Sequence, residues 1–173
     1  MTFGSSEQYM FTAHNIVNEW EESSIADIIY GYGEERYSRR IANAIVEARI
    51  KSEIKTSKQL ADIIYDSVPS FYKKGRIHPA TKTFQAIRIT VNNELESLKT
   101  LLTDGFKILS PGGKMAIISF HSLEDRIVKQ FFNNHYKDQS ALKLIKKPIT
   151  ASTEERTTNP RSRSAKLRII EKI

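Results

Sequence analysis

The sequence of 173 residues contains no cysteine. A disulfide framework, a thiolate metal site and a cysteine nucleophile are therefore excluded, and the composition fits a reducing compartment. It also has no apolar run of about 18 residues and no leader with a basic start and an apolar stretch. We therefore expect neither a membrane span nor a signal peptide, and predict a soluble protein of the cytoplasm.

Several motifs of catalysis and nucleotide binding are also missing. Gly31 and Gly33 follow an expected helix rather than a strand, which argues against a dinucleotide loop, and no Gly-x-x-x-x-Gly-Lys segment is present. The four histidines share no metal-ligand spacing, and the nucleophile elbow of serine hydrolases does not occur. We therefore expect no metal site and no phosphate loop of these kinds.

Basic residues are in excess, mainly in the C-terminal part. The formal net charge is +7, yet residues 1–60 hold 7 Lys/Arg against 9 Asp/Glu, whereas residues 61–173 hold 20 against 11. Such a surface attracts polyanions, among them nucleic acids. Because solvated basic faces are common, the charge alone leaves the partner open.

The N-terminal part has the pattern of an all-helical segment. Apolar residues recur with helical spacing over residues 12–68, whereas residues 1–11 show no period and are expected to be a poorly ordered lead-in. Expected capping residues are Thr12, Ser24 with Asp27, and Thr56 with Gln59. The predicted organisation is a lead-in at 1–11, a helical domain at 12–77 and a second domain at 78–173.

From residue 78 the pattern becomes that of an α/β sheet. A long helical pattern with a break near Asn92-Asn93 precedes the turn SPGGK and the apolar run MAIISF, which is typical of a strand buried on both faces. Ser122 and Asp125 are expected to cap the next helix. Two further strands are predicted in LKLIKK and KLRIIEKI, separated by a mobile surface loop, PITASTEERTTNPRSRS. This order describes the second half of an open α/β sheet.

The densest mixture of ionisable side chains, SFHSLEDR, directly follows the apolar run. In open α/β sheets ligands bind outside the carboxyl ends of the strands, so this position favours a function such as contact with a base edge or a phosphate. Alternatively, the residues only cap the helix, with Arg126 paired to Glu124 or Asp125 and His121 satisfied within the loop. The pattern alone leaves both interpretations open.

Four consecutive segments make the sequence resemble one known family. They are YGEERYSRRIANAIV, HPATKTFQAIRITVNNELESL, LSPGGKMAIISFHSLEDRIVKQFF and NPRSRSAKLRIIEK, in order from about residue 12 to residue 173. These segments resemble signatures of the ribosomal small subunit methyltransferase H family. The resemblance implies transfer of a methyl group from S-adenosylmethionine to N4 of a cytidine in 16S ribosomal RNA.

The resemblance covers only the last part of the family's chain. Members begin with a Rossmann-like half that carries a glycine-rich cofactor loop, an acidic residue for the ribose and an Asp-Leu-Gly-Val-Ser-Ser segment, and none of these occurs here. We therefore expect an α/β fold: the C-terminal half of a Rossmann-like class I methyltransferase sheet plus an all-helical insertion, 12–77, that helps to recognise RNA. No residue is assigned to the cofactor.

The resemblance implies a truncated or split enzyme that lacks its cofactor-binding half. Its expected partners are small-subunit ribosomal RNA or the assembled small subunit, together with a separate N-terminal half. Two alternatives remain: a non-catalytic RNA-binding or ribosome-associated module, and a decayed fragment.

One wall of a substrate site carries over to this sequence. The candidate active-site wall comprises His78, Ser119, Phe120, His121, Ser122, Glu124 and Asp125. The candidate RNA-binding residues are Arg88, Arg126, Arg161 and Arg163. Because N4 of cytosine is a weak nucleophile, the base must be aligned with the methyl donor and its proton accepted or relayed. His121 and Asp125 are the candidates for orienting the base, and no residue is assigned as the catalytic base.

Overall fold

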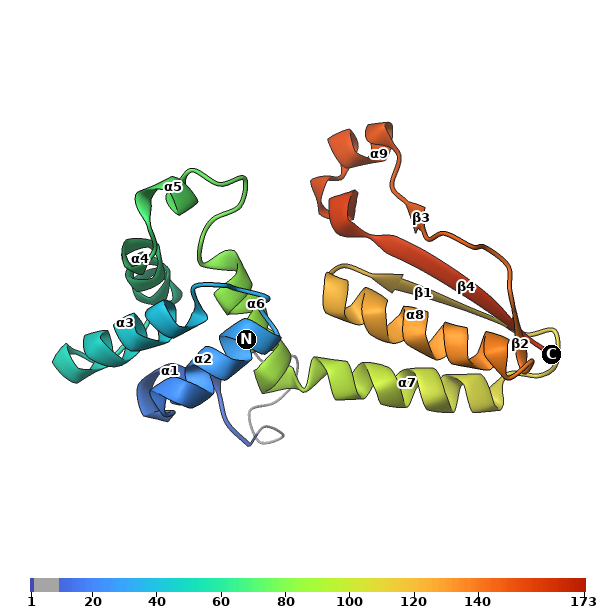
Figure 1. Cartoon of the computed structure of the whole chain (residues 1–173), viewed down its shortest axis with the longest axis horizontal. Helices are drawn as coiled ribbons and strands as arrows, with labels where there is room; N and C mark the ends of the chain where they lie inside the picture. Colours follow the sequence, from blue (N-terminus) through green and yellow to red (C-terminus); the bar gives the residue numbers. More distant parts are fainter. Residues whose placement is uncertain (2–9) are drawn as a thin grey trace. The chain divides into compact units, whose positions relative to one another are not determined.

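The computed structural model describes Met1 and residues 10–173 (Figure 1). Most of the lead-in predicted for residues 1–11 lies outside the described residues. The chain divides into two compact units, Met1–Glu94 and Leu95–Ile173. Within the described part of the chain, no helix is both long enough and apolar enough to cross a bilayer.

In the described residues of the first unit, all regular secondary structure is helical. Its helices are α1 (Ala13–Glu19), α2 (Glu22–Gly31), α3 (Ser38–Lys51), α4 (Ser57–Ser67), α5 (Ser70–Lys73) and α6 (Thr81–Asn92). Thr12 and Thr56 form the predicted N-caps, each with a reciprocal capping box. The cap predicted at Ser24 is wrong, because α2 begins three residues earlier than expected, after Glu21. Glu22 then lies in the first turn, where its negative charge interacts favourably with the helix dipole.

Isoleucines dominate the core of this unit. The fully buried ones are Ile16, Ile25, Ile29, Ile41, Ile45, Ile64 and Ile87. Helix α6 contributes Ile87 and Val91 to the same core, so the compact unit extends past residue 77 to Glu94. The chain breaks where predicted: Asn93 adopts a left-handed conformation with φ 49°, which asparagine tolerates better than most residues, and α7 (Glu94–Ile108) follows.

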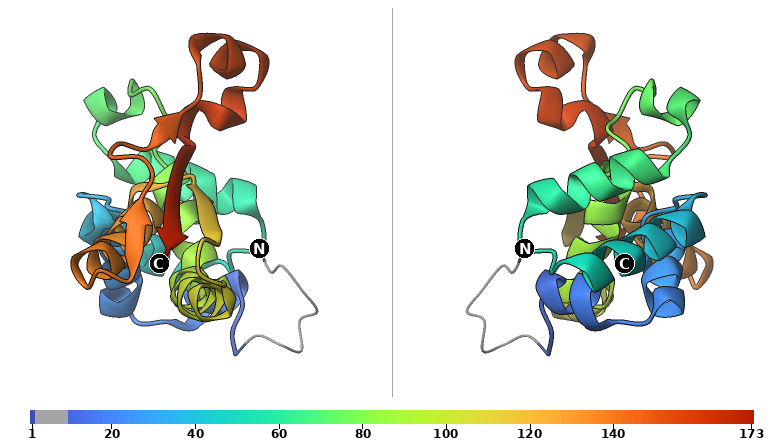
Figure 2. Two further views of the ribbon diagram at one scale, coloured as in Figure 1. Left: turned by 90° about the vertical axis from the view of Figure 1, so that its right-hand side faces the viewer. Right: turned by 90° about the vertical axis from the view of Figure 1, so that its left-hand side faces the viewer.

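The second unit combines helices with a small antiparallel sheet (Figures 1 and 2). After α7 come β1 (Lys114–Ser119), α8 (Ser122–Lys137), β2 (Ala141–Lys143), β3 (Ile149–Thr150), α9 (Thr153–Thr158), the 3₁₀ helix η2 (Pro160–Ser164) and β4 (Lys166–Lys172). Strand β4 lies between β1 and β2 and also pairs with β3, always antiparallel. The α/β class is confirmed, whereas the described sheet by itself does not identify half of a Rossmann fold.

The expectation that β1 is buried on both faces is wrong. Met115 and Ser119 are buried on one face, where α8 packs against the sheet, whereas Ile118 on the opposite face is 57% exposed. Met115 pairs with Ile170 in the unit's core, and Ile118 pairs with Leu167 on the exposed face. The apolar run MAIISF therefore did not indicate that both faces of β1 are covered by described residues.

The segment predicted as a mobile loop, 148–164, contains ordered elements instead. Ser152 caps α9 by accepting from the N–H of Glu155, and Pro160 opens η2. Both elements remain on the surface, where Figure 2 shows them together beyond one end of β4. The N-cap at Ser152 was missed in the sequence, because the segment as a whole is polar and rich in serine and threonine.

Candidate functional site

His121 caps α8 at the point where β1 ends. Its Nδ1 accepts from the N–H of Glu124 at 3.4 Å, and the Glu124 carboxylate accepts from the N–H groups of Phe120 at 2.8 Å and His121 at 3.3 Å. This is a capping box with histidine in the place usually taken by serine or threonine. The predicted cap formed by Ser122 and Asp125 is therefore wrong by one residue.

The cap leaves the second ring nitrogen of His121 without a hydrogen bond. Nε2 lies 3.3 Å from Oε1 of Glu124, but the angles are not those of a hydrogen bond, so this buried atom has no such partner among the described residues. Burial by itself would raise the pKa of Glu124, but the His121 side chain and the Phe120 N–H outweigh it and lower that pKa. The pair thus places an ionised carboxylate 3.3 Å from a buried imidazole nitrogen at the start of α8.

Asp125 joins α8 to β4. Its carboxylate accepts from Nε of Arg168 at 2.6 Å, from Nη2 of Arg168 at 3.2 Å and from Nζ of Lys166 at 3.0 Å. Burial by itself would raise the pKa of Asp125, but Arg168 and Lys166 outweigh it and lower that pKa. These contacts use the carboxylate to hold two elements together.

The remaining members of the predicted wall differ in their surroundings. Ser119 is buried and its Oγ donates to the Lys166 carbonyl at 3.4 Å, whereas Phe120 is 55% exposed. Ser122 is also exposed. His78 belongs to the first unit, where its exposed ring stacks on Tyr65 with centroids 5.7 Å apart. Only the residues 119–125 are therefore brought together within one unit.

The predicted RNA-binding arginines also differ. Arg88 is held by Glu94 through two bonds of 2.8 and 3.0 Å. Arg161 and Arg163 are exposed on η2 and have no ion-pair partner within the described residues, and Arg126 is exposed near the start of α8. Arg161 and Arg163 are thus better placed than Arg88 to receive a phosphate.

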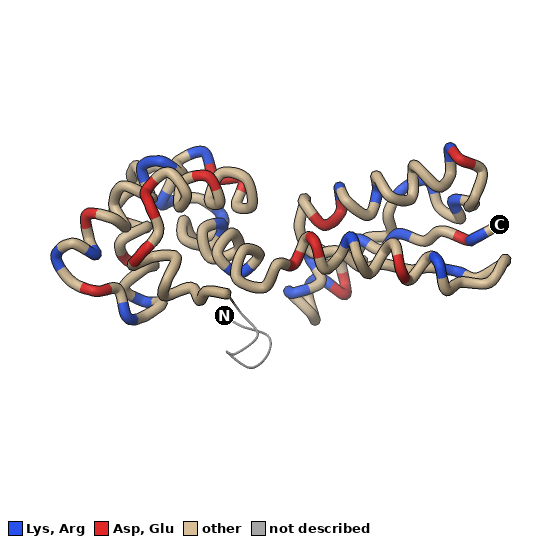
Figure 3. The backbone as a smooth tube through the Cα atoms, turned by 90° about the horizontal axis from the view of Figure 1, so that it is seen from below, with Lys and Arg blue, Asp and Glu red and all other residues tan. Residues whose placement is uncertain are grey.

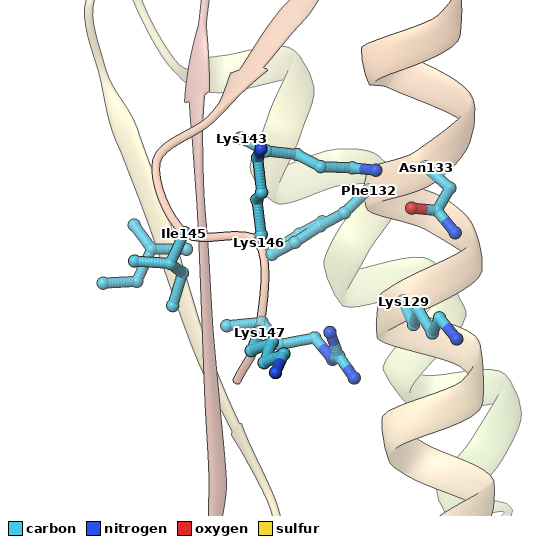
Figure 4. A pocket seen from close by; sticks show the side chains of 9 residues that line it. Lys129, Phe132, Asn133, Lys143, Ile145, Lys146 and Lys147 are labelled. Atoms are coloured by element: carbon cyan, nitrogen blue, oxygen red, sulfur yellow. The ribbon is translucent and has the colours of Figure 1, made fainter. Parts of the chain in front are cut away.

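A basic hollow was missed in the sequence. Figure 4 shows lysines from α8, from the end of β2 and from the segment that follows it around this hollow, whose volume is about 50 Å³. Its cationic lining residues are Lys129, Lys143, Lys146, Lys147 and Arg168, and no acidic residue lines it. Lysines at three positions of LKLIKK were the available signal, but that segment was interpreted only as a strand.

Two hollows of the second unit have linings that do not fit S-adenosylmethionine. The sulfonium of this cofactor is positively charged, so the lysines of the basic hollow would repel it. A second hollow of about 450 Å³, lined by Lys99, Thr103 and Gln130 among others, offers no carboxylate for ribose hydroxyls. No cofactor contact is therefore assigned to this chain.

The comparisons with known proteins identify the family. A model of the MraW methylase family matches residues 4–173. The chain belongs to this family. Proteins named ribosomal RNA small subunit methyltransferase H are 55% identical over 166 residues in Persephonella marina and 56% identical over 163 residues in Nostoc punctiforme, and each alignment covers 94% of this chain.

The chain covers only part of each of those relatives. The aligned region is 55% of the Persephonella marina protein and 52% of the Nostoc punctiforme protein, so the chain spans about half the length of the curated relatives it matches. A relative from Treponema denticola is 49% identical over 177 residues, and the aligned region is 56% of its length. The cluster at 119–126 and η2 both lie inside the region that the family model matches.

Exchanging His121 for alanine is expected to lower the free energy of unfolding by about 1 kcal/mol, because the side-chain cap of α8 is lost. His121→Asn should be nearly neutral, since asparagine is itself a strong capping residue. Urea denaturation of both variants provides the comparison. Equal destabilisation by alanine and asparagine would contradict a capping role.

Proposed function

We propose that this chain is the part of a methyltransferase that receives RNA, and that together with an S-adenosylmethionine-binding part it methylates N4 of a cytidine in small-subunit ribosomal RNA. The observation that carries the proposal is an incomplete sheet next to the polar cluster. Strand β1 is an edge strand in the described sheet, and its exposed face is apolar. A row of unpaired backbone groups beside exposed apolar side chains is a surface suited to further strands and helices.

The exposed face extends across the sheet. Ile118, Leu142 and Ile149 are each at least half exposed, although strand residues of this kind are normally covered. Phe120 continues this surface directly before the His121 cap. A cofactor-binding part that pairs with β1 would therefore lie next to the wall at 119–125, as the family resemblance implies for an active site.

The residues of the wall have distinct tasks in this proposal. The imidazole of His121, held in place by the capping bonds and by Glu124, would help to orient the target base. Asp125 would act as a positioning residue, because its carboxylate is engaged by Arg168 and Lys166. A bound methyl donor supplies the transferable methyl group, and the wall aligns N4 with it.

The charge distribution supports RNA as the substrate. Residues 95–173 hold 15 Lys/Arg and 8 Asp/Glu, whereas residues 1–94 hold 12 of each, so the whole excess lies in the second unit. Figure 3 shows where these charges fall along the backbone. The basic hollow and the exposed arginines of η2 would hold phosphates, which position RNA without reading its sequence.

Reconstitution tests the proposal directly. The chain alone should show no binding of S-adenosylmethionine by calorimetry, whereas a mixture with the unmatched part of the Persephonella marina relative should methylate small-subunit RNA, detected as N4-methylcytidine by mass spectrometry. Ile118→Arg should abolish methylation by the mixture, because it places a charge on the exposed face of the sheet. The matched control is Ile108→Arg, at an exposed position on α7. Tight binding of the cofactor by the isolated chain would refute the proposal.

The same assay distinguishes a role of His121 in methyl transfer from its role as the N-cap of α8. His121→Asn should preserve stability but lower methyl transfer at least about tenfold, since the imidazole is lost while the cap remains. If His121→Asn transfers methyl groups at the original rate, the histidine serves only as the cap of α8.

The lysine-lined hollow also supports a second function, a non-catalytic RNA-binding module. In that case the chain would bind small-subunit RNA, with affinity falling as salt rises, but reconstitution would give no N4-methylcytidine. Binding that ignores salt would exclude this alternative.

A further inference from the structure

A hollow of about 490 Å³ lies between the end of α2 and the start of α3. Its polar and aromatic lining residues are Asp27, Tyr30, Arg36, Tyr37, Arg39 and Arg40. The volume falls within the range of roughly 300–1,000 Å³ that is typical of small-molecule sites, which is room for a nucleotide.

Three arginines face this hollow against one acidic residue, Asp27. Arg39 and Arg40 are exposed, and neither has an ion-pair partner within the described residues. Both lie in the first turn of α3, which contains no acidic residue. Because positive charge is unfavourable at this end of a helix, the two arginines reduce the stability of α3, and helix formation does not account for them.

Arg36 is held in place by aromatic rings. Its guanidinium carbon lies 4.9 Å from the ring centroid of Tyr37 and 5.3 Å from that of Tyr72. Tyr72 in turn donates a hydrogen bond to the buried carboxylate of Glu35. A guanidinium fixed in this way loses little conformational freedom when it binds a phosphate.

Tyr30 adds an open aromatic surface. Its side chain is 68% exposed on the last turn of α2, next to the arginines. Aromatic rings beside basic groups are the combination by which proteins stack bases of single-stranded nucleic acids and hold their phosphates. The first unit as a whole has no net charge, so this local group is not the by-product of a generally basic unit.

We propose that this hollow binds single-stranded RNA, with one base stacked on Tyr30 and adjacent phosphates held by Arg36, Arg39 and Arg40. The choice of RNA as the polyanion rests on the proposed function. The site itself is a second RNA contact, in a different unit from the wall at 119–125 and from the basic hollow.

The arginines are tested by fluorescence anisotropy of the full chain with a labelled, short single-stranded oligoribonucleotide. Arg39→Gln combined with Arg40→Gln should weaken binding about tenfold and reduce the slope of log K against log salt by about 1.4, since each phosphate contact on a single strand contributes roughly 0.7. Lys51→Gln combined with Lys58→Gln removes the same charge outside the hollow. Lys51 lies about 18 Å along α3 from Arg39, by the helical rise of ~1.5 Å per residue.

Tyr30 is tested in the same titration. Tyr30→Ala should weaken binding by at least about fivefold without changing the salt slope, because stacking involves no counterion release. Tyr30→Phe should restore binding, since the ring is kept. Because these side chains are exposed, no variant should melt earlier than the original chain, and the arginine double variant should melt slightly later, since it removes positive charge from the first turn of α3.

Three outcomes overturn the inference. The first is an equal loss of RNA binding in the arginine and lysine double variants, which would mean general charge attraction. The second is unchanged binding by Tyr30→Ala. The third is displacement of RNA by polyglutamate as effectively as by unlabelled RNA, which would identify an acidic peptide site. Because RNA binding is read without methyl transfer, a failed reconstitution would refute the proposed function while leaving this test intact.

Discussion

Asp125→Asn is expected to lower the free energy of unfolding by about 3 kcal/mol, near the lower limit for breaking a buried ion pair. The carboxylate bridges α8 and β4. The side chain of Asp125 is only 12% exposed, and that of Arg168 is 15% exposed. Removing the negative charge leaves Arg168 partly desolvated without its counter-ion. Urea denaturation monitored by circular dichroism measures the loss.

Surface pairs provide the control for Asp125. Asp104→Asn removes a partner of Lys107 at 3.0 Å, but both side chains are more than 60% exposed, so the cost should stay below about 1 kcal/mol. Pairing Asp125→Leu with Arg168→Met should recover much of the loss, because an apolar pair no longer leaves a buried charge. A cost for Asp125→Asn equal to that of Asp104→Asn would show that the bridge contributes little.

The same residue predicts an acid limit of stability. The pKa of Asp125 is lowered in the folded state, so its contribution is complete above the ordinary value of 3.8 and is lost as the pH falls below it. Unfolding free energies between about pH 2 and pH 5 should therefore change less in Asp125→Asn than in the original chain. Parallel pH curves for the two proteins would contradict the assignment.

Glu35→Ala is expected to cost at least about 3 kcal/mol, the second large effect. The carboxylate is fully buried between α2 and α3, where it accepts from the N–H of Tyr37 at 2.9 Å and from the hydroxyl of Tyr72, with Lys82 Nζ 3.9 Å away. Truncation leaves a cavity and unpaired donors around it. The loss of the Tyr72 contact should also free α5, so that trypsin cleaves faster at Lys73.

Two comparisons make the Glu35 result interpretable. Glu53→Ala removes an exposed carboxylate that pairs with His14 and Lys55, and should destabilise the chain far less than Glu35→Ala. Burial, and after it the neighbouring Glu35 carboxylate, raises the pKa of Tyr72 to about 12. The contribution of Tyr72 to the free energy of unfolding is therefore complete below its ordinary pKa of 10 and is lost between about pH 10 and 12. Unchanged tryptic cleavage at Lys73 would show that Glu35 does not hold α5.

Local signals in the sequence were sufficient for several elements. Thr12 and Thr56 cap helices as predicted, and the break between α6 and α7 falls at Asn93, because capping and left-handed turns depend on a few neighbouring residues. Histidine is an uncommon N-cap, so the same reasoning misplaced the start of α8 by one residue. The four ordered motifs also identified the family that the comparisons show.

Contacts between distant residues decided the candidate site. Asp125 and Arg168 are 43 residues apart, and their pairing follows from packing α8 on β4. The hollow between α2 and α3 likewise joins the end of one helix to the start of another.

The sequence by itself therefore determined the helical periods, the starts of α1 and α4, the absence of cysteine chemistry and the family, since these depend on neighbouring residues or on ordered motifs. Only the tertiary structure decided the antiparallel pairing around β4, the exposed apolar face at Ile118 and the role of Asp125 as a bridge. The physical reason is that an apolar run records an affinity for burial but not which surface supplies it, and a carboxylate finds its partner only after the chain has folded.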